Sequence, residues 1–351
     1  MSAPQPSLQH LARLCDDTGI FEHAIGALPR RSDGYCTDDA GRALAVACRS
    51  GEPVAERIAE VALSFLIHAH AGGGRFRLRM GFDRRWTSDP LSDDANGRAI
   101  FGLGVAASMA RWPHVRRGAR RLFEESAAFR STWPRAIAHA AIGATELLLM
   151  DPSCGPARAL VDDAAQALPR SGVDPAWPWP EPRLAYSNAL LAEGLLAAGS
   201  AAEDPATVRD GLRLLSWLAD TETGDHHLSF ASAAGWAAGE HRPAFDQQPI
   251  EAAAMADACA RAFDLTGDRT WLEPLRLAVG WFEGLNDVGV RMFDPATGGA
   301  FDGLEADGVN ENQGAESTIA FVTTMQQAER LLTGERRDPA GQPEAISASS
   351  S

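Results

Sequence analysis

Two related segments decide the fold, TDDAGRALAVA at residues 37–47 and SDDANGRAIFGLG at residues 92–104. Four further segments share their plan, a polar opening followed by an apolar helical stretch, and begin at residues 135, 183, 246 and 312. They read RAIAHAAIGATELL, RLAYSNALLAEGLLAAG, DQQPIEAAAMADACARAF and NQGAESTIAFVTTMQQA, and the first of these four has lost its opening acid. A pattern repeated six times along the chain indicates a repeat architecture.

Amphipathic segments of higher charge alternate with the six repeats, at residues 7–17, 53–69, 114–129, 156–168, 205–219 and 270–285. In the segment 53–69 the apolar residues Val54, Ile58, Val61 and Phe65 recur at helical spacing. The six repeats are rich in Ala and Gly, which allow helices to approach closely. We therefore predict an all-α (α/α)6 toroid in residues 1–332, with the repeats as the inner ring and the charged helices as the outer ring. Residues 333–351 are polar and are expected to be a disordered tail.

The lengths of the connections predict where the functional site lies. Connections from an inner helix to the next outer helix are short. Those from an outer to an inner helix are long at residues 18–36, 71–91, 171–182, 222–245 and 286–311, and short only near residues 131–134. All long connections therefore emerge at the N-termini of the inner helices. Long loops in compact domains usually carry function, so we expect the site on that face.

Composition excludes several classes of function. The formal net charge of -15 argues against a nucleic-acid partner or an anionic membrane surface. No apolar run is long enough to span a bilayer, and the N-terminus lacks the pattern of a signal peptide. The five cysteines form no CxxC, which favours a reducing compartment, so we expect a cytoplasmic protein.

The histidine spacing does not predict a metal site. His68 and His70 lie two residues apart on an expected helix, and His226 and His227 are adjacent in a loop. Neither pair has the spacing of a zinc site, and no nucleotide-binding motif is present, so no metal or cofactor is predicted.

The carboxylates that open the inner helices are the candidate catalytic residues: Asp38, Asp39, Asp94, Glu251 and Glu316. Helix capping is the alternative interpretation, because Thr37 and Ser92 are favoured N-cap residues and acids suit the first turn of a helix. Capping leaves Glu251 and Glu316 unexplained, since each is expected one turn inside its helix beside alanines, where a lone charge is costly. A water-filled central funnel removes that cost.

Aromatic, amide and charged residues on the same face predict a carbohydrate ligand, because sugar faces stack on indole and hydroxyls need many polar partners. The candidate binding residues are Arg84, Arg85, Trp86, Trp177, Trp179, Glu181, Tyr186, Asn188, Gln247, Gln248, Asp302, Asn312 and Gln313. Core packing is the alternative for each Trp, and it is less expected for the two that prolines isolate in a loop. The arginines of residues 75–85 either neutralise nearby acids or bind an anionic group of the substrate.

The chain resembles the six-hairpin glycosidase superfamily of (α/α)6 toroids. The resemblance rests on the predicted architecture and on TDDAGRA, RRWTSDPLSDDANGRA, WPWPEPRLAYSNALL, FDQQPIEA and FDGLEADGVNENQGAEST. The same segments are similar to toroid domains found beside bacterial glycosyltransferases, which implies a functional link to such an enzyme. The superfamily implies a carbohydrate-active site at the N-termini of the inner helices, often with a pair of carboxylates.

The leading hypothesis from the sequence is a glycoside hydrolase acting on an oligosaccharide or glycoconjugate. Glu251 and Glu316 are then the expected general acids, since an alanine-rich wall raises the pKa of a carboxyl, and Asp39 and Asp94 are the expected bases. Two carboxylates roughly 5–10 Å apart at the base of one cleft would favour hydrolysis. Acids that are all engaged by arginines or helix caps would favour a non-catalytic glycan-binding module.

A sugar lyase, isomerase or epimerase is the alternative enzyme. Such an enzyme needs a His or Tyr base, and Tyr35, His139 and Tyr186 are the candidates. His139 lies one turn into the acid-poor third repeat, where it is expected to face the funnel or to be a buried core histidine.

Overall fold

The computed structural model describes residues 5–87 and 92–332 of the chain. The inner ring comprises α2 (Thr37–Arg49), α4 (Asp93–Met109), α6 (Pro134–Met150), α8 (Ala189–Ala201), α10 (Pro249–Thr266) and α12 (Ala315–Leu332). The outer ring comprises α1 (Gln9–Leu14), α3 (Ala55–Ala69), α5 (Pro113–Ser126), α7 (Gly155–Ala167), α9 (Pro205–Glu222) and α11 (Leu272–Glu283).

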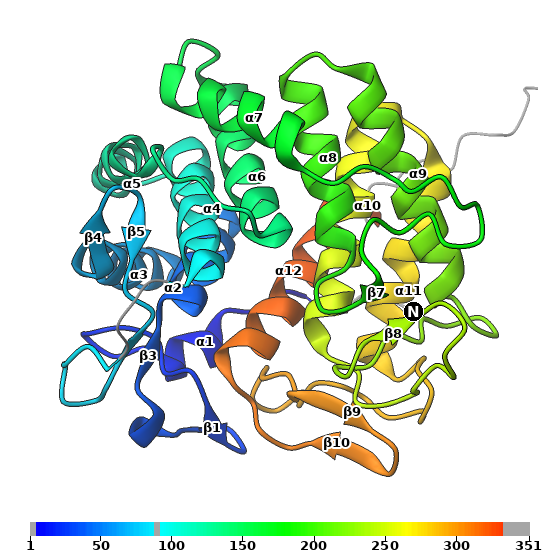
Figure 1. Cartoon of the computed structure of the whole chain (residues 1–351). Helices are drawn as coiled ribbons and strands as arrows, with labels where there is room; N and C mark the ends of the chain where they lie inside the picture. The colour runs from blue at the N-terminus through cyan, green and yellow to red at the C-terminus, as the bar shows by residue number, and fades with distance from the viewer. Residues whose placement is uncertain (1–4, 88–91, 333–351) are drawn as a thin grey trace, which may run out of the picture.

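The inner helices form a closed ring. Each contacts the next, and α12 returns to contact α2 (Figure 1). The predicted (α/α)6 toroid and the assignment of each segment to its ring are therefore confirmed. The first outer helix is shorter than the predicted segment 7–17, since it ends at Leu14, where the chain turns into an extended conformation at Cys15. The predicted tail of residues 333–351 lies outside the described residues.

Glycines set the spacing of the first three inner helices. A Cβ atom on Gly102 of α4 would lie 2.2 Å from the carbonyl oxygen of Gly41 in α2. A Cβ atom on Gly104 would lie 2.0 Å from the carbonyl oxygen of Gly143 in α6. Both distances are far below van der Waals contact, so the backbones approach at positions where only glycine fits. The prediction that small residues allow close packing of the inner ring is confirmed here.

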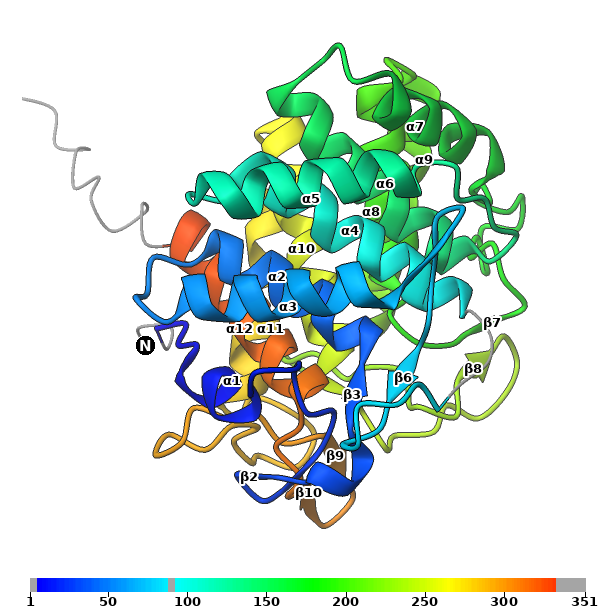
Figure 2. The ribbon, with the colours of Figure 1, turned by 90° about the vertical axis from the view of Figure 1, so that its left-hand side faces the viewer.

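Strands of the long connections form short antiparallel pairs on one side of the ring, three of them hairpins within one connection and two of them joining different connections (Figure 2). The pairs are β1 (Ala24–Ile25) with β2 (Leu28–Pro29), β3 (Tyr35–Cys36) with β6 (Arg79–Met80), β4 (His70–Gly72) with β5 (Arg75–Phe76), β7 (Arg183–Leu184) with β8 (Trp236–Ala237), and β9 (Gly303–Glu305) with β10 (Gly308–Asn310). Register pairs Tyr35 with Met80, which joins the first long connection to the second. The connection from α5 to α6 carries no hairpin.

Two hydrophobic clusters fill the space between the rings. One includes apolar residues of α1 to α5, and the other includes those of α8 to α11. Both clusters take residues from α6, α7 and α12, so these three helices join the halves of the ring. Within the described part of the chain, no helix has the length and apolar character needed to cross a membrane.

Candidate active site

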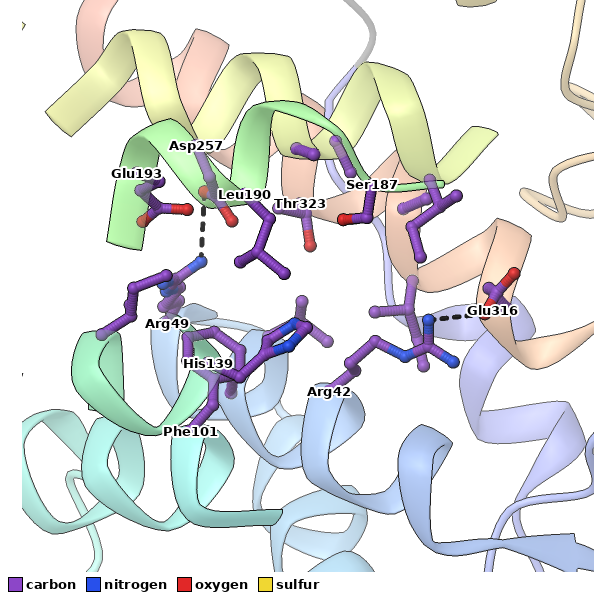
Figure 3. A pocket seen from close by; sticks show the side chains of 18 residues that line it. Arg42, Arg49, Phe101, His139, Ser187, Leu190, Glu193, Asp257, Glu316 and Thr323 are labelled. Atoms are coloured by element: carbon purple, nitrogen blue, oxygen red, sulfur yellow. Dashed lines mark hydrogen bonds and ion pairs between the residues drawn. The ribbon is translucent and has the colours of Figure 1, made fainter. Parts of the chain in front are cut away.

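Two adjoining cavities lie inside the ring, and both are lined by Arg42 of α2 and Glu316 of α12. The central cavity also receives Arg49, Phe101, His139, Ile142, Ser187, Leu190, Glu193, Ile250, Asp257, Ile319 and Thr323 (Figure 3). The polar cavity, on the side of the long connections, also receives Glu22, His23, Cys36, Asp38, Asp39, Arg79, Gln248, Asp302, Asn310 and Ser317. The structure thus brings together Asp38, Asp39, Gln248, Asp302 and Glu316 from the predicted set.

Arg42 binds two of the predicted catalytic carboxylates. Its Nη2 donates to Asp39 Oδ1 at 2.8 Å, and its Nη1 donates to Glu316 Oε2 at 2.6 Å. Burial raises the pKa of Asp39 to about 7, although the charge of Arg42 opposes that rise. Burial also acts to raise the pKa of Glu316, but the charges of Arg42 and Arg98 outweigh it and hold that pKa below its usual value. One guanidinium therefore separates two carboxyls whose pKa values are shifted in opposite directions.

Arg98 of α4 has the same arrangement one repeat further along the ring. Its Nη1 lies 3.1 Å from Asp38 Oδ2 and 3.6 Å from Asp94 Oδ2. Burial raises the pKa of Asp38 against the charges of Arg98 and Arg42. Asp38 Oδ1 is buried without a hydrogen-bond partner among the described residues. The acids that open the first two repeats are thus held by arginines from the same repeats.

His139 stands in the middle of the central cavity, and Figure 3 shows its ring between Arg42 and Arg49. Its Nδ1 lies 3.0 Å from the carbonyl oxygen of Arg135, which can only accept a hydrogen bond. The Nδ1 therefore carries the proton, and Nε2 keeps a free lone pair in the neutral ring. Burial, followed by the charges of Arg98 and Arg42, holds the pKa of His139 well below its usual value. The ring is consequently neutral at pH 7.

A third cavity, here called the outer cavity, lies at the start of α4 and α6 and shares no lining residue with the other two. It is lined by Ser92, Asp93, Asp94, Trp133, Pro134, Arg135, Glu181, Ala185 and Tyr186. Arg135 binds Glu181 through two hydrogen bonds of 2.8 and 2.9 Å. The Tyr186 hydroxyl donates to Asp94 Oδ2. Asp94, Glu181 and Tyr186 of the predicted set therefore meet here, separate from the polar cavity.

Glu251 differs from the other predicted acids because it lines none of the three cavities. It is 3% exposed and accepts hydrogen bonds from the backbone N–H groups of Ser187 and Asn188 and from the Asn188 side chain. Burial raises the pKa of Glu251 to about 7, and the nearby Glu222 reaches about 8 through burial and the charge of Glu251. The expectation that Glu251 faces the funnel is wrong, because its carboxyl caps the start of α8 instead.

The predicted tryptophans also lie away from the cavities. Trp177 packs edge to face against Trp217 and Trp236, and Trp179, which is 3% exposed, stacks on Trp217. Trp86 packs against Phe65 and His68 of α3. The expectation that prolines keep Trp177 and Trp179 out of the core is wrong, because residues from α9 and the next long connection cover them.

Most of the predicted amides hold the long connections in place. Gln247 is fully buried and accepts from the Phe230 backbone and from Trp281 Nε1, both at 3.1 Å. Asn188 accepts from the Ala185 backbone at 2.9 Å. Asn312 accepts from the Ala24 backbone at 2.7 Å, and Gln313 accepts from Thr297 at 2.8 Å. These side chains support the rim of the site, whereas Gln248 and Asp302 line it.

The arginines of the second long connection pair with acids on the surface. Arg84 lies 2.9 Å from Asp17, and Arg85 lies 3.9 Å from Asp83. Both arginine side chains are more than half exposed. The interpretation of charge neutralisation is therefore supported for Arg84 and Arg85.

Several residues that shape the site were not singled out as catalytic or binding candidates from the sequence. Arg42 and Arg98 each pair with an acid of their own helix, and each also binds an acid from another helix. For Arg135 and Trp133, the only sequence feature that pointed to the site was their position beside the acid-poor third repeat. A group of possible metal ligands, Glu56, Glu60 and His114, lies on the outer helices, remote from the three cavities.

No protein-family model matches the sequence, and no match to a curated protein was found. Solved structures match over nearly the whole chain. A sugar epimerase from a ruminal bacterium superposes with a TM-score of 0.69 and 13% identity, over 92% of this chain and 95% of that one. A cellobiose 2-epimerase from Bacillus thermoamylovorans gives 0.68 and 12%, over 92% of this chain and 96% of that one.

An α-mannanase from Bacteroides thetaiotaomicron also superposes, with a TM-score of 0.60 and 11% identity, over 93% of this chain and 95% of that one. These structural neighbours are members of the (α/α)6 toroid glycosidase superfamily, so the predicted resemblance is confirmed at the level of the fold. At such low identities the similarity establishes the fold alone.

Proposed function

We propose that this protein is a carbohydrate-active enzyme that moves a proton on a sugar, as an epimerase or isomerase does. The observation that carries the proposal is His139, a neutral base with a free Nε2 in a cavity between charged groups. Among the solved structures compared above, the two epimerases superpose better than the α-mannanase, which supports the same class of reaction.

The proposed reaction needs no cofactor. Nε2 of His139 takes the proton from the carbon next to the carbonyl of an open-chain sugar, and the electron pair of the broken C–H bond forms an enediolate. The guanidinium of Arg42, which lines the same cavity, stabilises the negative charge on the enediolate oxygen. Return of the proton from His139 to the neighbouring carbon, while the hydroxyl proton moves between the two enediolate oxygens, gives an isomer. An epimer forms when the planar enediolate turns its opposite face to His139 before the proton returns to the first carbon.

The test is deuterium incorporation from D₂O into a panel of neutral mono- and disaccharides, followed by mass spectrometry and NMR. The expected product has one deuterium at the carbon next to the carbonyl, and His139→Asn should lower its rate of formation by at least about 100-fold. His241→Asn, a change at an exposed histidine, is the matched control and should leave the rate unchanged. Full turnover by His139→Asn would exclude this base.

A glycoside hydrolase remains the second candidate, because Asp39 and Glu316 have pKa values shifted in opposite directions across one guanidinium. That pattern suits an acid and a base, but with Asp39 as the acid and Glu316 as the base, the reverse of the roles assigned from the sequence. Arg42 occupies the space between the two carboxyls, where a glycosidic oxygen would have to lie, so we place hydrolysis second. Products heavier by one water per cleavage, lost in Glu316→Gln, would reverse this order.

A further inference from the structure

The outer cavity contains a tryptophan that the fold leaves uncovered. Trp133 is 64% exposed, and it is the only tryptophan among the exposed large apolar side chains of residues 5–87 and 92–332. The other tryptophan rings for which the structure records ring contacts pack against neighbouring aromatic side chains. An exposed indole at the edge of a polar cavity is a common platform for a sugar ring, which places its apolar C–H face on the indole and its hydroxyls toward polar groups.

The backbone of Trp133 is held in place before any ligand binds. Its N–H donates to Ser131 Oγ at 2.9 Å, and that hydroxyl donates to Asp93 Oδ2 at 2.6 Å. Pro134 follows as the first residue of α6, where its ring restricts the backbone. A preorganised aromatic platform loses little conformational entropy when a ligand stacks on it.

Hydrogen-bonding groups line the same cavity as the indole. Asp93 and Asp94 each use Oδ2 within the protein, for Ser131 and Tyr186 respectively. Arg135 and Glu181 line the same cavity as a bidentate pair. Three carboxylates against one arginine give the cavity a negative balance, so it suits the hydroxyl donors of a neutral sugar and disfavours a uronic acid or phosphate.

Two residues connect this cavity to the candidate active site. The guanidinium of Arg135 lies in the outer cavity, while its carbonyl oxygen binds His139 Nδ1. Tyr186 lines the outer cavity, and the next residue, Ser187, lines the central cavity. The two cavities therefore flank the same two segments of the chain, residues 135–139 and 186–187.

From this geometry we infer that the outer cavity is a second sugar-binding subsite. It takes a neutral pyranose unit stacked on Trp133 while the reacting unit of the same chain lies beside His139. The substrate class is then a linear neutral di- or oligosaccharide rather than a monosaccharide. The inference rests on the proposed function only for the identity of the reacting unit, because stacking on Trp133 requires no chemistry.

The test measures binding instead of turnover. Dissociation constants for linear gluco- and manno-oligosaccharides of one to four units are determined by calorimetry for the full chain and its variants. The full chain should bind two units more tightly than one, and Trp133→Ala should weaken binding of the longer sugars by about five- to tenfold without affecting monosaccharides. Trp133→Phe should restore most of the affinity. Phe82→Ala, at another exposed aromatic residue, is the matched control and should leave every constant unchanged.

The outcomes separate this subsite from the proposed reaction. If affinity depends on Trp133 but no deuterium is incorporated, the subsite stands and the proposed enzyme fails. If deuterium is incorporated but Trp133→Ala binds every length as the unsubstituted chain does, the subsite fails and the enzyme stands. If the unsubstituted chain shows no gain in affinity from one unit to four, the inference is overturned.

Discussion

Two arginines organise the carboxylates around the funnel. Arg42 joins Asp39 of its own helix to Glu316 of the last helix, and Arg98 joins Asp94 to Asp38 of the preceding repeat. Each pair within a helix follows from the three- or four-residue spacing of acid and arginine in the repeated segments. The repeat therefore encodes an ion pair, and the neighbouring inner helix adds the second acid, which ring closure supplies for Arg42.

Removal of Arg42 should destabilise the fold. Arg42→Ala leaves Asp39 buried without its counter-charge, so we expect the free energy of unfolding to fall by about 3 kcal/mol. Urea denaturation followed by circular dichroism measures this change. Arg121→Ala removes an exposed arginine paired with Glu125 and should leave the free energy unchanged. An equal effect of the two substitutions would contradict the buried network.

The buried carboxyls Glu222 and Glu251 should make the fold less stable as pH rises. Their pKa values of about 8 and about 7 lie above those of an unfolded chain, so the folded state binds more protons between about pH 4 and pH 8. Their contribution to stability is complete below pH 4 and is lost as pH passes through 7 and 8. Urea denaturation at pH 5.5 and pH 8 should show this loss, and Glu222→Gln should reduce the difference. A difference unchanged by Glu222→Gln would contradict the assignment.

Side chains whose partners come from distant segments were the least predictable from the sequence. Trp177 and Trp179 lie between prolines, which suggested exposed rings, but Trp217 and Trp236 reach them from later segments. Glu251 precedes a run of alanines in its helix, but its partners are the backbone groups of Ser187 and Asn188. The local pattern of apolar residues predicts which face of a helix is apolar. It does not predict which loop covers that face.

At the scale of the elements, the repeat made the helices predictable. The spacing of apolar residues predicted both rings, and the unequal lengths of the connections predicted that the long connections lie on one side. Helix ends were less predictable where no capping signal exists, as in α1, whose N-cap Leu8 makes no side-chain cap. The sequence identified the glycines of α4 as small residues. It could not show that they face carbonyl oxygens of α2 and α6.

Substitution of an inner-ring glycine should separate two helices. Gly104→Ala places a methyl group against the Gly143 carbonyl of α6, so we expect a loss of about 2 kcal/mol in the free energy of unfolding. Gly118→Ala, on the outer helix α5, meets only the flexible end of Leu63 at 3.1 Å and should be neutral or stabilising by about 0.5 kcal/mol. Thermal and urea denaturation compare the two variants. A neutral Gly104→Ala would show that the inner ring can expand.

At the scale of the whole molecule, the two halves of the ring should lose stability together. Phe282 belongs to the cluster of the second half, and both clusters share α6, α7 and α12. Phe282→Ala should therefore speed amide hydrogen exchange in α2 to α5 as well as in α8 to α11. Mass spectrometry of exchanged peptides tests this, with Ile67→Ala on the exposed side of α3 as control. Faster exchange confined to α8–α11 would mean that the halves unfold independently.

The short connection between α5 and α6 makes the rim of the ring asymmetric. The connections that precede α2, α4, α8, α10 and α12 each carry at least one paired strand, whereas the connection from Ala127 to Trp133 carries none. The rim of the funnel therefore lacks strands at this one connection among the described residues. Trp133 is the last residue of that connection. Under the proposed function, a sugar chain too long for the interior would leave at this connection without displacing a paired strand. This gap, and not the volume of the interior, would then set the length of chain that can bind.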